Sequence, residues 1–217
     1  MRGGRELFLV VLPVVLTAST AAAFWGASRW LGDDLGLLVG FGCYWAWCWA
    51  VPLAWWGPAG VRRLLAGGRP LFTRANGLLV AILAATVAGA LWGYFLPGLA
   101  RVSPWVMLFA PVAILNGTSE ELLWRGVYVE AFGRRAFWAW VFPSFGFALS
   151  HLSPQLVAVA EGGLVPFLGS TLLLGLAYGW VAFRTESARW TALAHGLIGL
   201  LAFGEPISTS LARLVVP

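Results

Sequence analysis

The sequence predicts an all-α protein: a polytopic bundle of about seven transmembrane helices, with its N-terminus inside the cell. Of its 217 residues, 60% are hydrophobic and 11% are charged, whereas about a quarter are charged in soluble domains. Mean hydropathy is +0.82, and the fourteen tryptophans suit the belts that aromatic residues form at membrane interfaces. We therefore expect an integral, multi-pass membrane protein.

The net charge of +5 does not indicate nucleic-acid binding, although the pI is near 10.0. The arginines are dispersed among the loops, and no basic stripe interleaved with aromatic residues is present. The two cysteines, Cys43 and Cys48, would diverge by about 140° on one helix, which suits neither a disulfide nor a zinc site. The expected surroundings are the lipid bilayer, with no nucleic-acid partner.

Seven apolar runs are long enough, or nearly so, to cross a bilayer. The first follows Arg2 and Arg5 and exceeds the apolar core of a signal peptide, so we interpret it as a retained helix. The expected spans are residues 7–30, 35–56, 77–96, 104–132, 137–151, 164–183 and 190–204.

Some interruptions are expected as well. Residues 57–76 are predicted to form a loop, and residues 153–163 a mixed, partly interfacial segment. Asn116 to Ser119 is poor helix sequence, and Ser119 could cap a fresh turn within the fourth span. Pro143 predicts a kink in the fifth span. A short tail containing Arg213 follows the seventh.

The distribution of arginines predicts the orientation. Ten fall on one side of the seven-span arrangement and three on the other, and Arg125 lies within the membrane. Because cytoplasmic loops are rich in Lys and Arg, the richer side is assigned to the cytoplasm. Its arginines are Arg2, Arg5, Arg62, Arg63, Arg69, Arg74, Arg134, Arg135, Arg184 and Arg189; the other side has Arg29, Arg101 and Arg213.

Three ionisable residues inside the fourth span, Glu120, Glu121 and Arg125, indicate a functional site. A charge at mid-bilayer costs roughly 2.5 to 3.5 kcal/mol on insertion scales, so an apolar run carries such residues for a reason. In a soluble protein the same residues would form a solvated helix turn. Glu121 shares a helix face with Arg125, four residues on, and should pair with it. Glu120 lies on another face with Asn116 and is the candidate general base.

The only two histidines, His151 and His195, lie in apolar spans at about the depth of Glu120. Glu120 and His151 are each roughly 20 Å along a helix from the turn at Gly133. A lone histidine on an apolar helix is usually a hydrogen-bonded interior residue. Two at the depth of a buried carboxylate favour one site that contains all three.

These residues resemble motifs of the CPBP family, which comprises CAAX prenyl proteases and bacteriocin-processing or abortive-infection-type membrane proteins. The matching motifs are Glu-Glu-x-x-x-Arg at 120–125, Phe-x-x-x-His at 147–151 and the segment around His195. The resemblance covers about residues 105–204. It implies one integrated membrane domain in which residues 1–104 supply three spans and residues 105–217 form the catalytic core with four.

The resemblance implies an intramembrane endopeptidase that acts on a peptide or a membrane-anchored protein. Glu120 would activate water, His151 would orient that water or protonate the leaving amine, and His195 would stabilise the oxyanion. Glu121 and Arg125 would fix the helix and the local field, and Phe147 would pack the His151 ring. No cofactor is required in this scheme. Zinc held by Glu120, His151 and His195 is the alternative, although no His-Glu-x-x-His spacing is present.

One position departs from the family pattern. Asn or Asp commonly stands four residues after the third-motif histidine, and here that residue is Gly199. Asn116 is a candidate substitute on the Glu120 face. The departure keeps open a non-catalytic alternative: an immunity protein, a scaffold or a proton-coupled carrier that has the family fold. The lack of an inverted repeat is evidence against a carrier, and purely structural helix packing leaves Glu120 unexplained.

Overall fold

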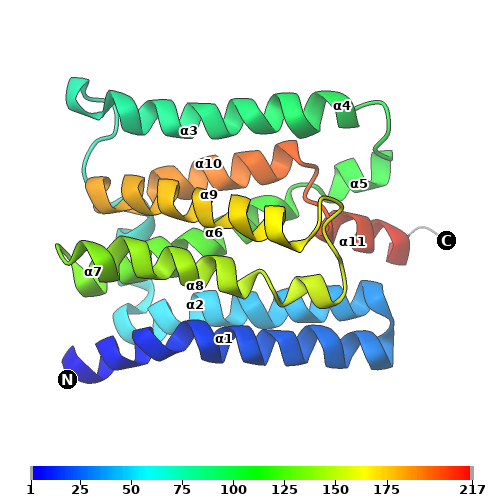
Figure 1. The fold of residues 1–217 in the computed structure, drawn as a ribbon, viewed down its shortest axis with the longest axis horizontal. Helices are drawn as coiled ribbons and strands as arrows, with labels where there is room; N and C mark the ends of the chain where they lie inside the picture. The colour runs from blue at the N-terminus through cyan, green and yellow to red at the C-terminus, as the bar shows by residue number, and fades with distance from the viewer. Residues whose placement is uncertain (1, 216–217) are drawn as a thin grey trace.

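The computed structural model describes residues 2–215, which form helices joined by short turns and contain no strand (Figure 1). Four helical stretches are long and apolar enough to cross a membrane: Gly3–Leu31, Asp33–Ala66, Arg74–Gly98 and Leu164–Thr185. This confirms the all-α, multi-pass membrane bundle. The other expected spans are built from shorter helices, so the total of seven stays a prediction.

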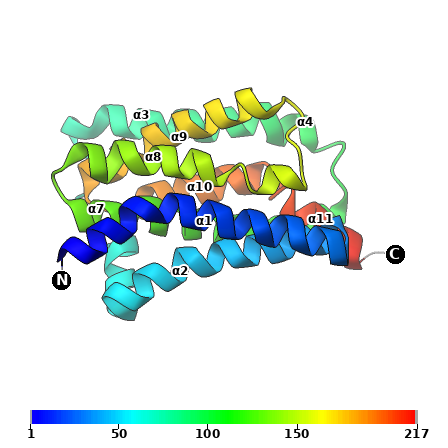
Figure 2. The ribbon, with the colours of Figure 1, turned by 60° about the horizontal axis from the view of Figure 1, so that its bottom comes forward.

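Helices α1 (Arg2–Leu31) and α2 (Asp33–Ala66) form an antiparallel hairpin along one side of the bundle. The turn between them is the single residue Gly32, whose φ of 83° suits glycine. A long helix on the opposite side comprises the 3₁₀ turn η1 (Arg74–Asn76), α3 (Gly77–Ala90), the π-helical turn η2 (Leu91–Phe95) and α4 (Leu96–Gly98). Figures 1 and 2 show the remaining helices between these two sides.

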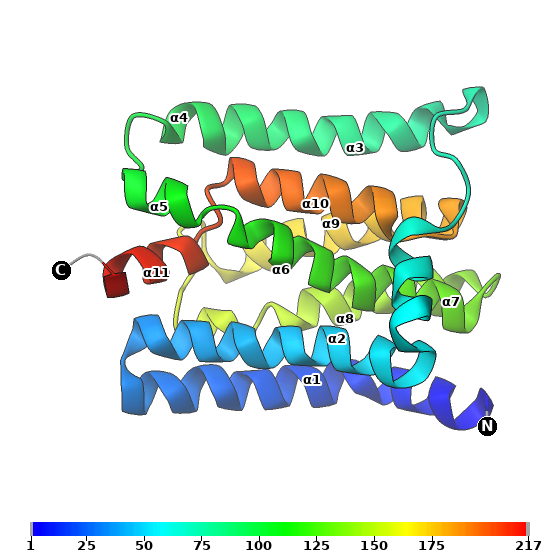
Figure 3. The same cartoon turned by 180° about the vertical axis from the view of Figure 1, so that it is seen from behind.

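The prediction of a loop over residues 57–76 was wrong for its first half. Helix α2 continues to Ala66 after a sharp bend at Gly57, which has φ 63° and ψ −178°. Pro58 follows the bend, in a position where its fixed φ suits the start of a helix. The segment after the bend lies across the bundle (Figure 3) and buries Val61 and Leu64. Those buried contacts hold it as a helix.

The fourth expected span is broken, as predicted, but at a different place. It comprises α5 (Pro104–Phe109), α6 (Val112–Glu121), the π-helical segment η3 (Leu122–Val127) and α7 (Tyr128–Phe132). The break lies at Pro111, which has no N–H to continue the helix. Ser119 is therefore not a cap: it lies inside α6 and donates its hydroxyl to the carbonyl of Leu115 at 2.7 Å.

The C-terminal half completes the bundle. A π-helical turn, η4 (Phe137–Val141), directly precedes α8 (Phe142–Ser150), so the helix is irregular just before Pro143. After the 3₁₀ turn η5 (Pro154–Leu156) come α9 (Leu164–Thr185) and α10 (Arg189–Leu201). The tail that contains Arg213 forms a further helix, α11 (Ile207–Val215), which packs against α5 and α2 and was not predicted.

The main core brings both halves of the chain together. Residues of α1 and α2 pack in one buried cluster with the segment 122–132 and with Phe147 of α8. Trp124 and Tyr128 stack in this cluster with ring centroids 5.9 Å apart, and both side chains are almost fully buried. The π-helical segment η3 starts directly after Glu121 and carries Arg125, so the irregular backbone coincides with the charged residues. Such π-helical insertions are frequent at functional sites.

Candidate active site

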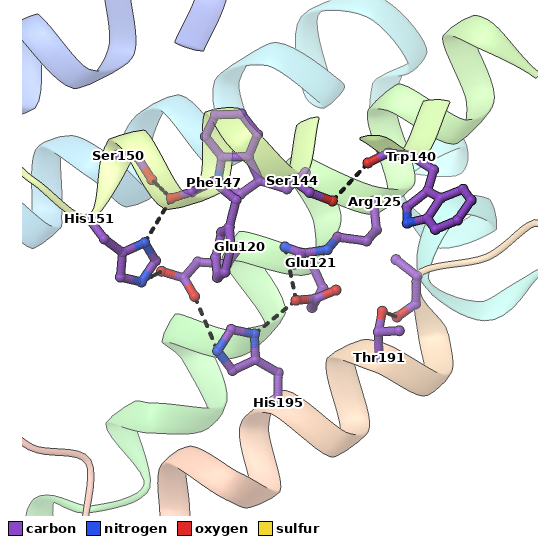
Figure 4. Close-up of polar contacts among 12 residues, drawn as sticks. Glu120, Glu121, Arg125, Trp140, Ser144, Phe147, Ser150, His151, Thr191 and His195 are labelled. Carbon is purple, nitrogen blue, oxygen red and sulfur yellow. Dashed lines mark hydrogen bonds and ion pairs between the residues drawn. The ribbon is translucent and has the colours of Figure 1, made fainter. Parts of the chain in front are cut away.

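The residues that the sequence singled out meet inside the bundle (Figure 4). Glu120 and Glu121 end α6, Arg125 lies in η3, His151 directly follows α8, and His195 lies in the middle of α10. These elements are far apart in the chain but packed together, because α6 contacts α10 and α8 contacts η3. Glu120 is 2% exposed and Glu121 is fully buried, so their surroundings are protein rather than water.

Glu121 pairs with Arg125, as the four-residue spacing predicted. The Nη1 atom of Arg125 lies 3.2 Å from Oε1 of Glu121, and both side chains are at most 1% exposed. A buried charge that loses its partner typically costs about 3 to 5 kcal/mol. Removing either residue would therefore leave the other as an unpaired buried charge and destabilise the fold.

His195 joins the two carboxylates: its position near Glu120 was predicted, but its contact with Glu121 was not. Its Nδ1 lies 2.8 Å from Oε1 of Glu121, and its Nε2 lies 3.3 Å from Oε2 of Glu120. A neutral imidazole donates from only one ring nitrogen, so carboxylates at both nitrogens fit a doubly protonated ring. When His195 is doubly protonated, the net charge of the four side chains is zero: Glu120 and Glu121 are negative, and Arg125 and His195 are positive. A neutral set is the least costly arrangement for charges buried at this depth.

His151 stands on the other side of Glu120. Its Nδ1 lies 2.8 Å from the carbonyl oxygen of Phe147, which only accepts hydrogen bonds, so Nδ1 carries the proton. In the neutral ring, Nε2 is then an acceptor, and it lies 4.0 Å from Oε1 of Glu120. That separation is too long for a direct hydrogen bond and short enough for one bridging water molecule.

Phe147 packs the His151 ring, as expected, and also contacts the charged residues. Its ring meets that of His151 edge-on with centroids 4.6 Å apart, and it lies 6.1 Å from the ring of His195. The guanidinium of Arg125 lies over the Phe147 ring, with its central carbon 4.2 Å from the ring centroid. Phe147 thus fixes the relative positions of the histidines and of the ion pair.

Two tryptophans of α2 hold the helix that carries Glu120. Trp45 donates its indole N–H to Oδ1 of Asn116 at 2.9 Å, and Trp49 donates to the Ser119 hydroxyl at 2.8 Å. Because an indole can only donate, the Asn116 atom it meets is the carbonyl oxygen, and the NH₂ group of Asn116 points elsewhere. No pattern in the sequence predicts these contacts, because the tryptophans lie 71 and 70 residues before their partners.

Helices α6 and α10 approach closely because small residues line their contact. A Cβ at Gly117 would lie 2.7 Å from the backbone nitrogen of Gly196, and one at Gly199 would lie 2.9 Å from the Cβ of Ala113. This close approach brings His195 to the two glutamates. Gly199, the departure from the family pattern, is therefore a packing position in this chain.

Glu120 faces a cavity of about 740 Å³. Asn116, His151, Tyr44 and Ser150 also line it near Glu120, whereas His195 is not among the lining residues. The volume lies within the usual range for ligand pockets. A substrate in the cavity would therefore meet Glu120, His151 and Asn116, with His195 behind the carboxylate of Glu120.

The residues expected for zinc do not have a metal-binding arrangement. In the part of the chain that the structure describes, no group of three or more His, Cys, Asp or Glu side chains could hold a metal ion. The two oxygens of Glu120 face different histidines, and both nitrogens of His195 face carboxylates. These contacts leave no set of three side chains directed at one ion.

Comparison with known proteins agrees with the motifs. Residues 101–201 match the family model described as type II CAAX prenyl endopeptidase Rce1-like. No curated protein and no solved structure gives a significant match to the chain. The matched range contains Glu120, His151 and His195, and it agrees with the range over which the motifs were recognised. Over residues 101–201, the comparison thus supports the resemblance to CAAX proteases that the motifs indicated.

Proposed function

We propose that the protein is an intramembrane endopeptidase in which Glu120 activates the attacking water. The observation that carries this proposal is the position of Glu120, a buried carboxylate that faces a substrate-sized cavity and lies between two histidines. Its neighbour Glu121 is held by Arg125 and His195, so Glu120 is the carboxylate directed at the cavity.

In the proposed reaction, a water molecule lies between Oε1 of Glu120 and Nε2 of His151. Glu120 takes a proton from this water as its oxygen attacks the carbonyl carbon of the scissile peptide bond, which gives a tetrahedral oxyanion. The C–N bond then breaks, and the proton passes to the leaving amine, directly from Glu120 or through Nε2 of His151. The products are a carboxylic acid and an amine, which exchange the acid proton to leave a carboxylate and an ammonium group, so no oxidant or further reactant is needed.

The oxyanion requires a hydrogen-bond donor on the cavity side. We assign this role to the NH₂ group of Asn116, because Trp45 already occupies its carbonyl oxygen and Asn116 lines the cavity. His195, which the family resemblance assigned to the oxyanion, lies behind Glu120 and bridges to Glu121. We propose that it orients Glu120 and balances its charge.

The test is cleavage of labelled peptides by the purified protein, by Glu120→Gln and by Glu130→Gln, a control whose carboxylate pairs with Arg63 outside the cavity. A farnesylated CAAX peptide and an unmodified basic leader peptide are included, and each reaction is run with and without a zinc chelator. We expect cleavage that is lost in Glu120→Gln, retained in the control and unaffected by the chelator. Glu120→Gln should retain the fold, which thermal unfolding in detergent would verify.

Other outcomes would point to other functions. Loss of cleavage with the chelator, and its return with added zinc, would replace the proposed chemistry with a metal site at Glu120, His151 and His195. Cleavage that persists in Glu120→Gln would remove this carboxylate from the reaction. A folded protein that cleaves no member of a broad peptide panel would favour the non-catalytic alternative.

A further inference from the structure

The two ends of the bundle differ in charge. Helix α1 starts at the same end where α2 finishes, where the α7–α8 turn lies, and where α9 meets α10 (Figure 1). This end, here called the arginine end, carries Arg5, Arg62, Arg63, Arg69, Arg74, Arg134, Arg135, Arg184 and Arg189. Its acidic residues Glu6, Glu130 and Glu186 pair with Arg135, Arg63 and Arg69.

The cavity beside Glu120 opens at the other end. Its lining includes the α1–α2 turn at Asp33 and Asp34, the segment 157–161 before α9, and residues at the start of α11. All of these lie at the end opposite the arginine end (Figures 1 and 3).

The asymmetry of charge determines which compartment the cavity faces. Membrane-crossing proteins retain Lys and Arg in their cytoplasmic loops, and this chain has nine arginines at the arginine end against Arg29, Arg101 and Arg213 at the other. The arginine end is therefore cytoplasmic, and the cavity opens on the outer side of the membrane. A prenylated C-terminus in the cytoplasm could not reach Glu120 through such an opening.

The mouth of the cavity is acidic. Asp33, Asp34, Glu161 and Glu205 line it, against a single arginine, Arg213, whose Nη1 lies 3.5 Å from Oδ1 of Asp34. Glu161 and Glu205 are exposed and have no basic partner among residues 2–215. Glu120, buried deeper along the same cavity, adds a further carboxylate. The field at the mouth attracts positive charge.

We propose that the cavity receives a basic polypeptide segment from the outer, arginine-poor side of the membrane, and this inference rests on the proposed peptidase function. The substrate class is a membrane-anchored or exported polypeptide with Lys or Arg next to the scissile bond, outside the membrane. Glu161 and Glu205 act as specificity-determining residues, because neither carboxylate has a basic partner in the described part of the chain; Asp33, which likewise has none, accepts a hydrogen bond from the Ser28 hydroxyl.

The side of the opening is tested without any cleavage. Single cysteines are introduced by Val159→Cys at the mouth and by Arg134→Cys at the arginine end, in a chain that carries Cys43→Ala and Cys48→Ala. Intact bacterial cells that express each variant are treated with a membrane-impermeant maleimide. We expect Val159→Cys to be labelled in intact cells and Arg134→Cys only after permeabilisation. The reverse pattern, or equal labelling of both in intact cells, would overturn the proposed orientation whether or not the protein is a peptidase.

The charge preference is tested by binding. Two fluorescent peptides that differ only by two Lys-to-Glu replacements are titrated onto the Glu120→Gln variant, which binds without hydrolysis. We expect the lysine peptide to bind at least about tenfold more tightly, a difference that shrinks in added salt because these charges are exposed. Glu161→Gln with Glu205→Gln should remove most of the difference, whereas Glu130→Gln with Glu186→Gln at the arginine end should not. Equal binding, binding of neither peptide, or a preference for the acidic peptide would overturn the basic specificity.

Discussion

Nδ1 of His195 lies 2.8 Å from Oε1 of Glu121, so the ring that contacts the candidate base is itself held by the neighbouring carboxylate. Glu121 also binds Arg125, which makes it the link between the ion pair and the histidine. The two adjacent glutamates therefore have different tasks: Glu120 faces the cavity, and Glu121 supports the residues around it.

This division predicts different effects for the same substitution at adjacent positions. Glu120→Gln should lower peptide cleavage by about 10² to 10⁴ and lower the unfolding temperature much less than Glu121→Gln does, because the general base is lost while the buried Glu121–Arg125 pair is kept. Glu121→Gln should lower both peptide cleavage and the unfolding temperature. Arg125 would remain buried without its partner, at a cost of about 3 to 5 kcal/mol. Thermal unfolding in detergent and single-turnover cleavage measure the two effects. Equal loss of folded protein in both variants would contradict the division.

The close packing at Gly199 predicts that the Asn common in the family would destabilise this protein. A Cβ at this position would lie 2.9 Å from the Cβ of Ala113, closer than real Cβ contacts. Gly199→Asn should therefore separate α10 from α6 and reduce stability, by about 1 to 3 kcal/mol for an overpacked contact. It should also reduce cleavage, because His195 moves with α10. A measured gain of activity in the single variant would show that the contact yields easily and that an asparagine improves the site.

The double variant Gly199→Asn with Ala113→Gly tests whether the close contact with Ala113 causes the loss of stability. Removing the Ala113 methyl takes away the atom that the new side chain would meet, so stability should recover relative to Gly199→Asn alone. Ala113→Gly by itself is the matched control, because it adds a helical glycine at a cost of about 0.5 to 1 kcal/mol. If the double variant is no more stable than Gly199→Asn, the close contact is not the cause of the loss.

The hydrogen bond from Trp45 to Asn116 predicts that the orientation of the Asn116 amide affects the rate of cleavage. Trp45→Phe removes the indole N–H that holds Oδ1 of Asn116 but keeps an aromatic ring in α2. The amide can then rotate, so we expect kcat to fall by about tenfold, with a small change in KM if Asn116 binds only the oxyanion. Trp47→Phe is the control, because it changes another tryptophan of α2 and removes a hydrogen bond to Ser19 of α1. A loss confined to KM would place Asn116 in substrate binding instead.

The sequence predicted the bundle and most of the site because both depend on short-range rules. Long apolar runs specify membrane helices, and a spacing of four residues places Glu121 against Arg125. The depth of His151 and His195 along their helices was enough to bring them near Glu120. Such features need only helix geometry and the distance of a residue from the end of its span.

What escaped prediction depends on contacts between distant segments and on local departures from the α-helix. The bridge from His195 to Glu121 requires the rotation of α10 about its axis, which spacing alone does not fix. The π-helical turn after Glu121 changes the phase of the helix without a distinctive residue. The helix over 58–66 was missed because Gly57, Pro58 and several arginines resemble a loop, whereas buried contacts of Val61 and Leu64 make it helical.

Gly117 provides the last prediction, on the distance between the two helices that form the site. A Cβ there would lie 2.7 Å from the nitrogen of Gly196 and 2.9 Å from the carbonyl carbon of His195, and both are backbone atoms that cannot rotate away. Gly117→Ala should thus displace α10, lengthen the contact between His195 and Glu120, and lower cleavage by more than tenfold. Gly89→Ala is the control, because a Cβ there meets nothing within 4 Å. It should leave cleavage unchanged and stabilise α3 slightly, by about 0.5 to 1 kcal/mol. Full activity in Gly117→Ala would mean that the approach of α10 to α6 does not control the position of Glu120.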